Sequence, residues 1–257
     1  QSTIDSLFIS GIDYIPLIDQ NKRIISIAKK GRQDFLIEGN LIGDDQPVEL
    51  ISYINSDLGP NGDATGSVNL PIPLADESVE DLAKRAVDEY GRLDMWVNNA
   101  GGSPIQAPLV DLPREEWEAT MALNLTAVWR CSAIAARYME GKGRILNISS
   151  LAAEDVIEGS GHYAAAKAGV NMLTRTFAKE LGPGIRVNCI MPGFVPTEIM
   201  MTALEINEEQ LPGLEKALKL PSGRLGTPRD LGAAALYLLS PATEWVTGQV
   251  IRVSGGM

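Results

Sequence analysis

The chain has 257 residues, of which 45% are hydrophobic and 21% charged, and it carries a formal net charge of -11. This length suits one large α/β domain, and the acidic balance argues against nucleic acid or an anionic membrane as a partner. No apolar run approaches the roughly 18 residues of a membrane span, and no basic residue precedes Lys22, so the sequence predicts neither a membrane helix nor a signal peptide.

The first 76 residues give only a weak pattern of elements. We expect, in chain order, a strand before residue 20, a helix over 23–31, a strand over 32–40, a helix over 47–59 and a strand at the end of 61–76.

From residue 77 onward, helices and strands alternate regularly. The periodicity predicts helices over 77–91, 113–140, 162–181 and 227–240, and strands within 92–102, 143–150, 185–193 and 248–256. Apolar strands between long helices imply a parallel sheet covered on both faces. We therefore expect an α/β fold, a Rossmann-like doubly wound parallel sheet, in a single domain over residues 1–257.

Polar stretches follow three of the predicted strands, namely NNAG, NISS and MPGFVPT. Ligands bind at the carboxyl ends of the strands in such a sheet. The sequence therefore places its candidate site at this edge.

The two cysteines and the one histidine bound the chemistry further. Cys131 and Cys189 lie in apolar segments, which predicts buried reduced thiols in a cytoplasmic protein. One histidine without a Cys/His cluster argues against zinc, so no metal is expected.

The stretch SGHYAAAKAG (160–169) sets Tyr163 and Lys167 one helical turn apart. A phenol can give a proton to a ketone oxygen or take one from an alcohol, and a neighbouring ammonium would lower its pKa from about 10 toward neutrality. A bare YxxxK is common by chance, and its alternative is a solvated amphipathic helix. The surrounding sequence has to decide.

Five motifs occur in the order typical of the short-chain dehydrogenase/reductase family, which the chain resembles strongly over 76–257 and weakly before. They are NNAG (98–101), Asn124 within LNLTA, Ser150 thirteen residues before the tyrosine, YAAAK (163–167) and PGFVPT (192–197). Residues 224–256 also resemble the family's carboxyl-terminal segment. Within the family, second-rank motifs look most like the bacterial 7α-hydroxysteroid dehydrogenases.

The resemblance implies a catalytic set of Asn124, Ser150, Tyr163 and Lys167. Tyr163 is then the acid and base, Ser150 bonds the substrate oxygen, and Lys167 also holds the nicotinamide ribose. Asn124 resembles the residue that anchors a relay water; its alternative is a mid-helix Asn bonding nearby backbone. Ser149 is the nearest rival of Ser150. For His162 we expect a solvent-facing imidazole rather than one lining the pocket.

The resemblance also implies contacts with a nicotinamide cofactor. Asn98, Ala100 and Gly101 resemble the loop under the adenosine ribose, where small residues let backbone approach a ligand. The other end of the cofactor would lie against Pro192, Gly193, Val195 and Thr197, the last two holding the nicotinamide carboxamide.

The cofactor's adenosine end is less well defined. Glu38, at the end of a predicted strand, would accept hydrogen bonds from the ribose diol and so favours NAD, with NADP left open. The family's TGxxxGxG loop is missing, since residues 9–20 read ISGIDYIPLIDQ. Either the pyrophosphate is held differently, or tight cofactor binding is lost, or the residues near the N-terminus differ from those of the natural gene.

These motifs together predict an NAD(P)-dependent oxidoreductase that transfers hydride between nicotinamide and a small secondary alcohol or ketone. A hydroxysteroid suits the Met-rich segment 198–223, which is either a substrate lid or an ordinary helix pair on the sheet. A 3-oxoacyl thioester is the alternative substrate, and a non-catalytic binding protein on the same fold is the alternative function. By analogy with the family, we expect a homotetramer or homodimer.

Overall fold

The computed structural model describes residues 17–18, 24–26, 50–52, 76–103 and 105–257. Its centre is a five-stranded sheet in the order β3-β4-β5-β6-β7, in which every neighbouring pair is parallel. The strands are β3 (Leu50–Ser52), β4 (Met95–Asn98), β5 (Gly143–Ile148), β6 (Ile185–Pro192) and β7 (Val250–Val253). The parallel sheet and the four strands predicted after residue 77 are confirmed.

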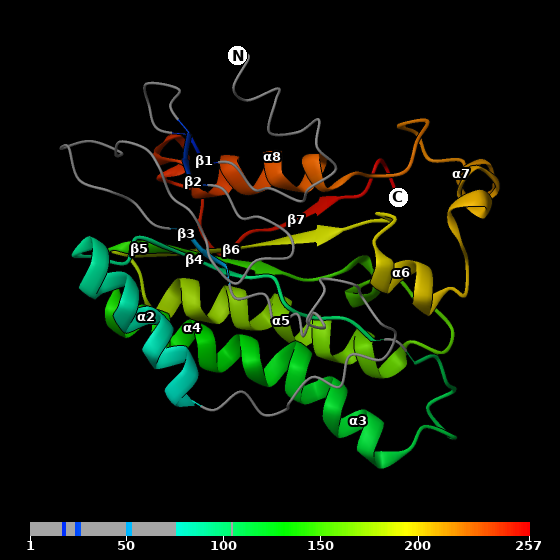
Figure 1. Cartoon of the computed structure of the whole chain (residues 1–257), viewed down its shortest axis with the longest axis horizontal. Helices are drawn as coiled ribbons and strands as arrows, with labels where there is room; N and C mark the ends of the chain where they lie inside the picture. The colour runs from blue at the N-terminus through cyan, green and yellow to red at the C-terminus, as the bar shows by residue number, and fades with distance from the viewer. Residues whose placement is uncertain (1–16, 19–23, 27–49, 53–75, 104) are drawn as a thin grey trace, which may run out of the picture.

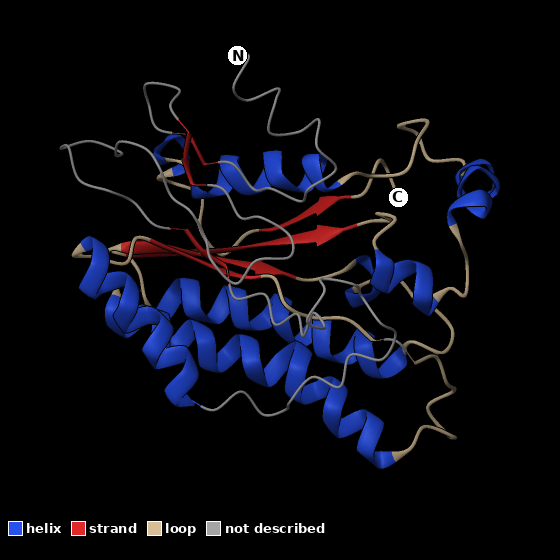
Figure 2. Cartoon of the chain, viewed as in Figure 1, coloured by secondary structure: helices blue, strands red, loops and turns tan. Residues whose placement is uncertain are grey.

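Helices cover both faces of this sheet, as Figures 1 and 2 show. One face carries α2 (Asp76–Tyr90), α3 (Arg114–Met121), the π-helical turn η1 (Ala122–Thr126), α4 (Ala127–Tyr138) and α5 (Gly161–Glu180). The other face carries α8 (Pro228–Leu239). Two short helices, α6 (Glu198–Ala203) and α7 (Leu211–Leu218), lie beyond the carboxyl ends of the strands with η3 (Glu208–Gln210) between them.

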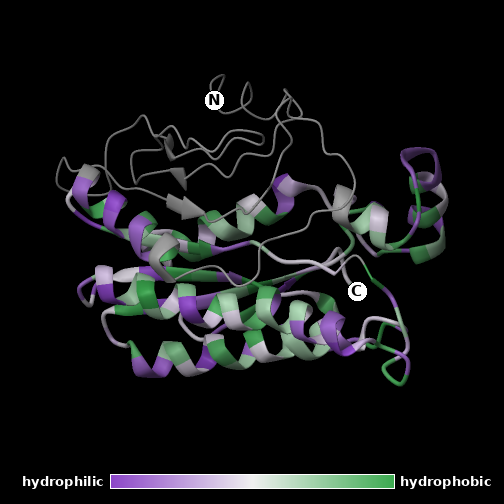
Figure 3. Ribbon diagram, turned by 60° about the horizontal axis from the view of Figure 1, so that its bottom comes forward, coloured by the Kyte–Doolittle hydropathy of each residue, from purple (hydrophilic) through white to green (hydrophobic). Residues whose placement is uncertain are grey.

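Alternate residues of the strands fill two separate cores. Trp96 packs with α2, α4 and α5, whereas its neighbours Met95 and Val97 pack with α8. This is the period-two alternation of a strand whose two faces are both buried. Figure 3 shows hydrophobic residues along the strands and along the helices beside them. Burying one such large side chain stabilises the fold by roughly 1.5–3 kcal/mol, so these layers hold the sheet edge in place.

The structure corrects two helix predictions in the first part of the chain. Ile24–Ser26 is strand β2, which pairs antiparallel with β1 (Leu17–Ile18), and Leu50–Ser52 is β3, which pairs with β4. Short runs of isoleucine and leucine suit a buried strand as well as a helix, and pairing with a neighbouring strand decides. The strands predicted over 32–40 and at the end of 61–76 lie outside the described residues.

Two helix details bear on the site. The predicted helix over 113–140 is helical from Arg114 to Tyr138, but a π-helical turn at Ala122–Thr126 interrupts it. Thr227 is the N-cap of α8, close to the predicted helix start, and forms a capping box with Asp230. In the part of the chain that the structure describes, no helix is both long and apolar enough to cross a bilayer.

Candidate active site

The three polar stretches meet at the carboxyl edge of the parallel sheet, where β4, β5 and β6 end side by side. Ser150 follows β5 and begins the 3-10 turn η2 (Leu151–Ala153), and Tyr163 lies in the first turn of α5. Gly161, at the start of α5, leaves room for Leu109 of the loop between β4 and α3, since a Cβ there would lie 2.8 Å from Leu109 Cδ1. The fold therefore brings residues far apart in sequence to one edge.

The Ser150 side chain lies beside the Tyr163 phenol, and hydrogen bonding from Ser150 acts to lower the phenol's pKa. The Ser150 oxygen also accepts from the Ala152 N–H at 3.2 Å, which fixes its direction. Its rival Ser149 is buried and donates to the Lys167 carbonyl at 3.0 Å. The predicted serine thus lies beside the tyrosine, whereas the neighbouring serine has a different partner.

Lys167 lies buried beside the tyrosine ring. Its Nζ is 5.6 Å from the centroid of the Tyr163 ring and donates to the Ile148 carbonyl at 2.9 Å. An ammonium has three N–H donors. Among the described residues, the Ile148 carbonyl accepts from one of them. Burial lowers the pKa of Lys167 to about 8. Two N–H groups therefore remain for hydroxyls of a bound molecule.

The expected shift of the tyrosine is wrong in this structure. Burial raises the pKa of the Tyr163 phenol, and the hydrogen bond from Ser150 opposes the rise only in part. The ammonium lies over the ring rather than at the hydroxyl, and it is held by Ile148. Helical spacing places Lys167 beside Tyr163, but it does not place the Lys167 ammonium at the phenol oxygen.

Asn124 lies in the π-helical turn η1 and is fully buried. Its Nδ2 donates to the carbonyls of Gly102 (2.9 Å) and Thr120 (3.0 Å), and its Oδ1 accepts from the Gly102 N–H (2.9 Å). The backbone-bonding alternative therefore describes these contacts, which fix the loop after β4. A carbonyl oxygen has two acceptor sites, so Oδ1 keeps one for a water, and the relay role stays a prediction.

Gly101 separates Asn124 from Lys167. A Cβ on this glycine would lie 2.7 Å from Asn124 Oδ1 and 2.9 Å from Lys167 Nζ. Both distances are shorter than real Cβ contacts, so the position requires a residue without a side chain. This packing reason adds to the expectation that backbone approaches a ligand here.

Asn98 belongs to a buried amide network that sequence reasoning missed. Its Nδ2 donates to Ser132 Oγ (2.8 Å) and to Asn147 Oδ1 (2.7 Å), while its Oδ1 accepts from Trp96 Nε1 (2.8 Å). Asn147 in turn donates to Thr174 Oγ1 at 2.9 Å. The Asn98 side chain thus links β4 to β5 and α4. A contact between Asn98 and a cofactor would therefore have to come from its backbone atoms. Ala100, the next small residue of the loop, is partly exposed.

The stretch after β6 is also tightly packed. Pro192 ends the strand, and a Cβ on Gly193 would lie 2.7 Å from the Ser254 Cα, so this glycine lets β6 approach the chain after β7. Val195 is buried, and the Thr197 hydroxyl accepts from the Met200 N–H at 3.3 Å to cap α6. Of these predicted cofactor residues, Thr197 therefore marks the start of α6.

The expected solvent-facing imidazole of His162 is wrong. The residue is fully buried, and its Nε2 lies 2.9 Å from Ser103 Oγ. The cause is the loop after β4, which carries Ser103 over the first turn of α5. Burial lowers the pKa of His162, with Glu116 opposing, so the imidazole is neutral near pH 7.

Other predictions concern residues elsewhere. Glu38 lies outside the described residues, as do residues 9–16 and 19–20 of the stretch that stands where the glycine-rich loop was expected. Cys131 and Cys189 are buried and form no disulfide, and burial raises the pKa of Cys189 to about 11, which confirms the prediction of buried thiols. Within the described ranges no group of three or more His, Cys, Asp or Glu side chains could hold a metal ion.

Comparison with known proteins gives a consistent result. The family model described as Enoyl-(Acyl carrier protein) reductase matches residues 74–257. The 3-oxoacyl-[acyl-carrier-protein] reductase FabG of Vibrio cholerae is 37% identical over 203 residues, which cover 78% of this chain and 79% of that protein.

Two solved structures agree. A 7α-hydroxysteroid dehydrogenase complexed with NADH and 7-oxo glycochenodeoxycholic acid has a TM-score of 0.63 at 37% identity, covering 71% of this chain and 70% of that one. A short-chain type dehydrogenase/reductase from Mycobacterium ulcerans has a TM-score of 0.65 at 34% identity, covering 71% and 66%. The resemblance noted over residues 76–257 is confirmed, and the chain belongs to the short-chain dehydrogenase/reductase family.

Proposed function

We propose that the protein, as an NAD(P)-dependent oxidoreductase of this family, moves hydride between nicotinamide and a secondary alcohol or ketone with Tyr163 as its acid and base. The observation that carries the proposal is the joined set of Ser150, Tyr163 and Lys167 at the sheet edge. A binding protein without chemistry has no need for a serine hydroxyl and a buried ammonium beside the same tyrosine.

The described residues fit a nicotinamide cofactor, which when bound would supply or accept the hydride. Lys167 offers N–H groups that match the two hydroxyls of a ribose. Gly101 leaves backbone accessible, and the stretch Pro192–Thr197 would lie at the nicotinamide end. We propose NAD as the cofactor because of Glu38, with NADP as the alternative.

The proton chemistry follows from the state of the phenol. Because burial raises the pKa of Tyr163, the hydroxyl is protonated near pH 7 and can give its proton to a carbonyl oxygen that Ser150 also binds. Oxidation of an alcohol needs the phenolate and is therefore favoured at alkaline pH. The remaining acceptor site of Asn124 would hold a water that returns the proton.

A hydroxysteroid or related rigid apolar alcohol is the substrate class that we propose first. Val110 and Val156 are almost fully exposed on the two loops that precede α3 and α5, and the Ala107 N–H donates to the Gly159 carbonyl to join these loops. The Met-rich segment 198–223, with α6 and α7, would close over them as a lid. A 3-oxoacyl thioester is the second candidate, favoured by the FabG relatives, although a net charge of -11 disfavours an acidic carrier protein.

The test is a substrate panel followed through the absorbance of the reduced nicotinamide. The purified chain is offered 7-oxosteroids and 3-oxoacyl thioesters of coenzyme A with NADH and, separately, NADPH. Tyr163→Phe should abolish turnover and leave NADH affinity, measured by fluorescence, unchanged. Turnover retained in this variant would refute the assignment, and no binding of either cofactor at millimolar concentration would favour the non-catalytic alternative.

A groove on the surface also supports the proposal of a homodimer or homotetramer. An apolar groove opens on η1, α4 and α5, lined by Leu125, Thr126, Trp129, Gly169, Met172 and Leu173. Trp129 and Met172 are at least half exposed there, which is typical of a surface covered by a second copy.

The buried cysteines suit a reducing compartment, which supports the proposal that the protein is cytoplasmic. We also propose that residues 1–257 form a single domain.

A further inference from the structure

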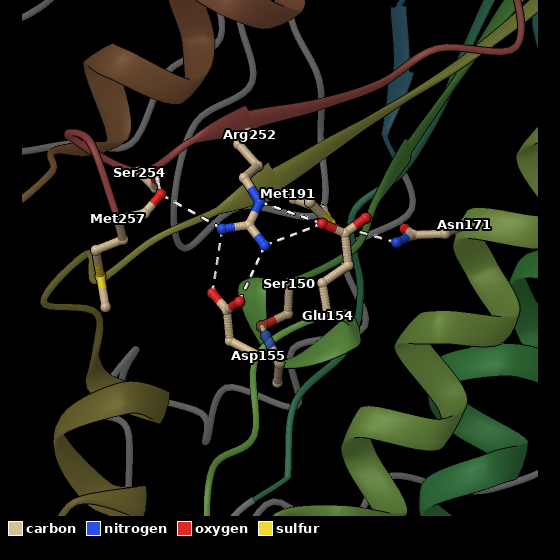
Figure 4. A network of polar contacts seen from close by, with 9 residues as sticks. Ser150, Glu154, Asp155, Asn171, Met191, Arg252, Ser254 and Met257 are labelled. Atoms are coloured by element: carbon tan, nitrogen blue, oxygen red, sulfur yellow. Dashed lines mark hydrogen bonds and ion pairs between the residues drawn. The ribbon is translucent and has the colours of Figure 1, made fainter.

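Arg252 of β7 holds two adjacent carboxylates at once (Figure 4). Its Nε and Nη2 donate to Glu154 Oε2 at 3.2 and 2.9 Å, and its Nη2 and Nη1 donate to the two oxygens of Asp155 at 3.0 and 3.2 Å. Arg252 Nη1 also lies 3.4 Å from the main-chain oxygen of Met257, and Ser254 Oγ donates to the same oxygen at 3.2 Å. All three guanidinium nitrogens are therefore engaged.

The two carboxylates stand at the far end of the turn that begins at Ser150. Within this turn the Ala153 N–H donates to the Ser150 carbonyl (3.0 Å), and the Glu154 and Asp155 N–H groups donate to the Leu151 carbonyl (2.9 and 2.8 Å). The Ser150 hydroxyl accepts from the Ala152 N–H in the same turn. The turn is short and closely bonded, so a displacement at Glu154 is transmitted to Ser150.

The cluster is suited to positioning more than to overall stability. The side chains of Arg252, Glu154 and Asp155 are 35%, 42% and 43% exposed, and exposed ion pairs contribute only about 0–1 kcal/mol each. Without the guanidinium, however, two neighbouring carboxylates would repel each other, and nothing else described would hold them to β7. The fork geometry of arginine joins both, which a lysine ammonium does less well.

We propose that Arg252 is a positioning residue for Ser150: from β7 it holds the turn after Ser150 so that the serine hydroxyl faces Tyr163. The inference rests on the proposed function, because Ser150 must act on the substrate for its position to matter. Arg252 itself touches neither the tyrosine nor Lys167 among the described contacts.

The test is a double-mutant cycle between Arg252→Gln and Ser150→Ala, with kcat normalised to the number of NADH sites. Arg252→Gln alone should lower kcat by on the order of ten-fold, as small misplacements of catalytic groups do. The NADH affinity of this variant should stay within about two-fold of wild type. The reason is that Lys167, which would bind the ribose, is held by the Ile148 carbonyl and not by Arg252. In the Ser150→Ala background the same change should alter kcat by less than about two-fold, because residues that act through one another are not additive. Arg252→Lys should recover part of the loss.

Arg114→Gln is the matched control, because it removes an exposed ion pair to Glu118 on α3, and it should leave kcat unchanged. If Arg252→Gln does not fold, Glu154→Gln with Asp155→Asn removes the same ion pairs and should show the same non-additive loss. Full additivity with Ser150→Ala, or an unchanged kcat in Arg252→Gln, would overturn the inference. An inactive wild type would instead contradict the proposed function, so the two failures are distinguishable.

Discussion

Gly101→Ala is the substitution that tests the site's geometry most directly. The added Cβ would lie 2.7 Å from Asn124 Oδ1 and 2.9 Å from Lys167 Nζ. Neither atom is free to move away, because Oδ1 accepts from the Gly102 N–H and Nζ donates to the Ile148 carbonyl, both at 2.9 Å. A hydrogen bond to a charged group is worth roughly 1.5–3 kcal/mol. Losing the one at Lys167 corresponds to a fall in kcat/KM of about 10- to 150-fold.

The assay measures kcat/KM with the best substrate of the panel and NADH affinity by fluorescence. Both should fall, since Lys167 is the residue that would bind the ribose. Arg114→Gln is the control, because it removes only an exposed ion pair to Glu118 on α3. If Gly101→Ala kept kcat/KM within about three-fold of wild type, the argument that Gly101, Asn124 and Lys167 form one rigid contact would be wrong.

Three further outcomes are expected. The pKa of Lys167 is lowered from 10.5 to about 8, so the unfolded chain holds the proton more tightly, and stability rises with pH between these values; denaturant unfolding at about pH 7 and pH 10 should show wild type gaining on Lys167→Met. Asp230→Asn removes the Arg224 fork and a helix cap and should lower the free energy of unfolding by about 1 kcal/mol at neutral pH. Because the Arg224 hydrogen bond holds the pKa of Asp230 below its ordinary 3.8, this difference should disappear as the pH falls below that value, and a constant difference would contradict the assignment. Trp129→Glu should dissociate the oligomer in sedimentation, whereas Trp245→Glu, a change at a fully exposed residue outside the groove, should not.

The sequence predicted the sheet, and it placed Ser150, Tyr163 and Lys167 near one another, because local signals carry both. Apolar runs between amphipathic helices determine parallel strands, and the polar residues that follow each run must then meet at one edge. The grouping of Ser150, Tyr163 and Lys167 follows from this topology and from helical spacing, whereas their proposed roles come from the resemblance to the family. The thirteen-residue offset also selected Ser150 over Ser149, and of these two serines it is Ser150 that influences the phenol's pKa.

Contacts across long sequence separations were not predictable in this way. The Asn98 amide faces Ser132 and Asn147, which are 34 and 49 residues away, so a residue assigned to a ligand-binding loop also holds the sheet together. Arg252 and Glu154 are 98 residues apart, and no spacing rule relates them. A polar residue in a turn can serve a ligand or the fold, and only the packed structure says which atoms remain available.

Tyr163 shows how far helical spacing can carry an electrostatic argument. Residues four apart on a helix are neighbours, and Lys167 Nζ is indeed 5.6 Å from the centroid of the tyrosine ring. Yet the position of the ammonium is fixed by its hydrogen bond to the Ile148 carbonyl on β5. Burial has the largest effect on the phenol's pKa, and it raises that pKa. The pKa of the phenol is accordingly set first by burial and then by Ser150, and not by the YxxxK spacing itself.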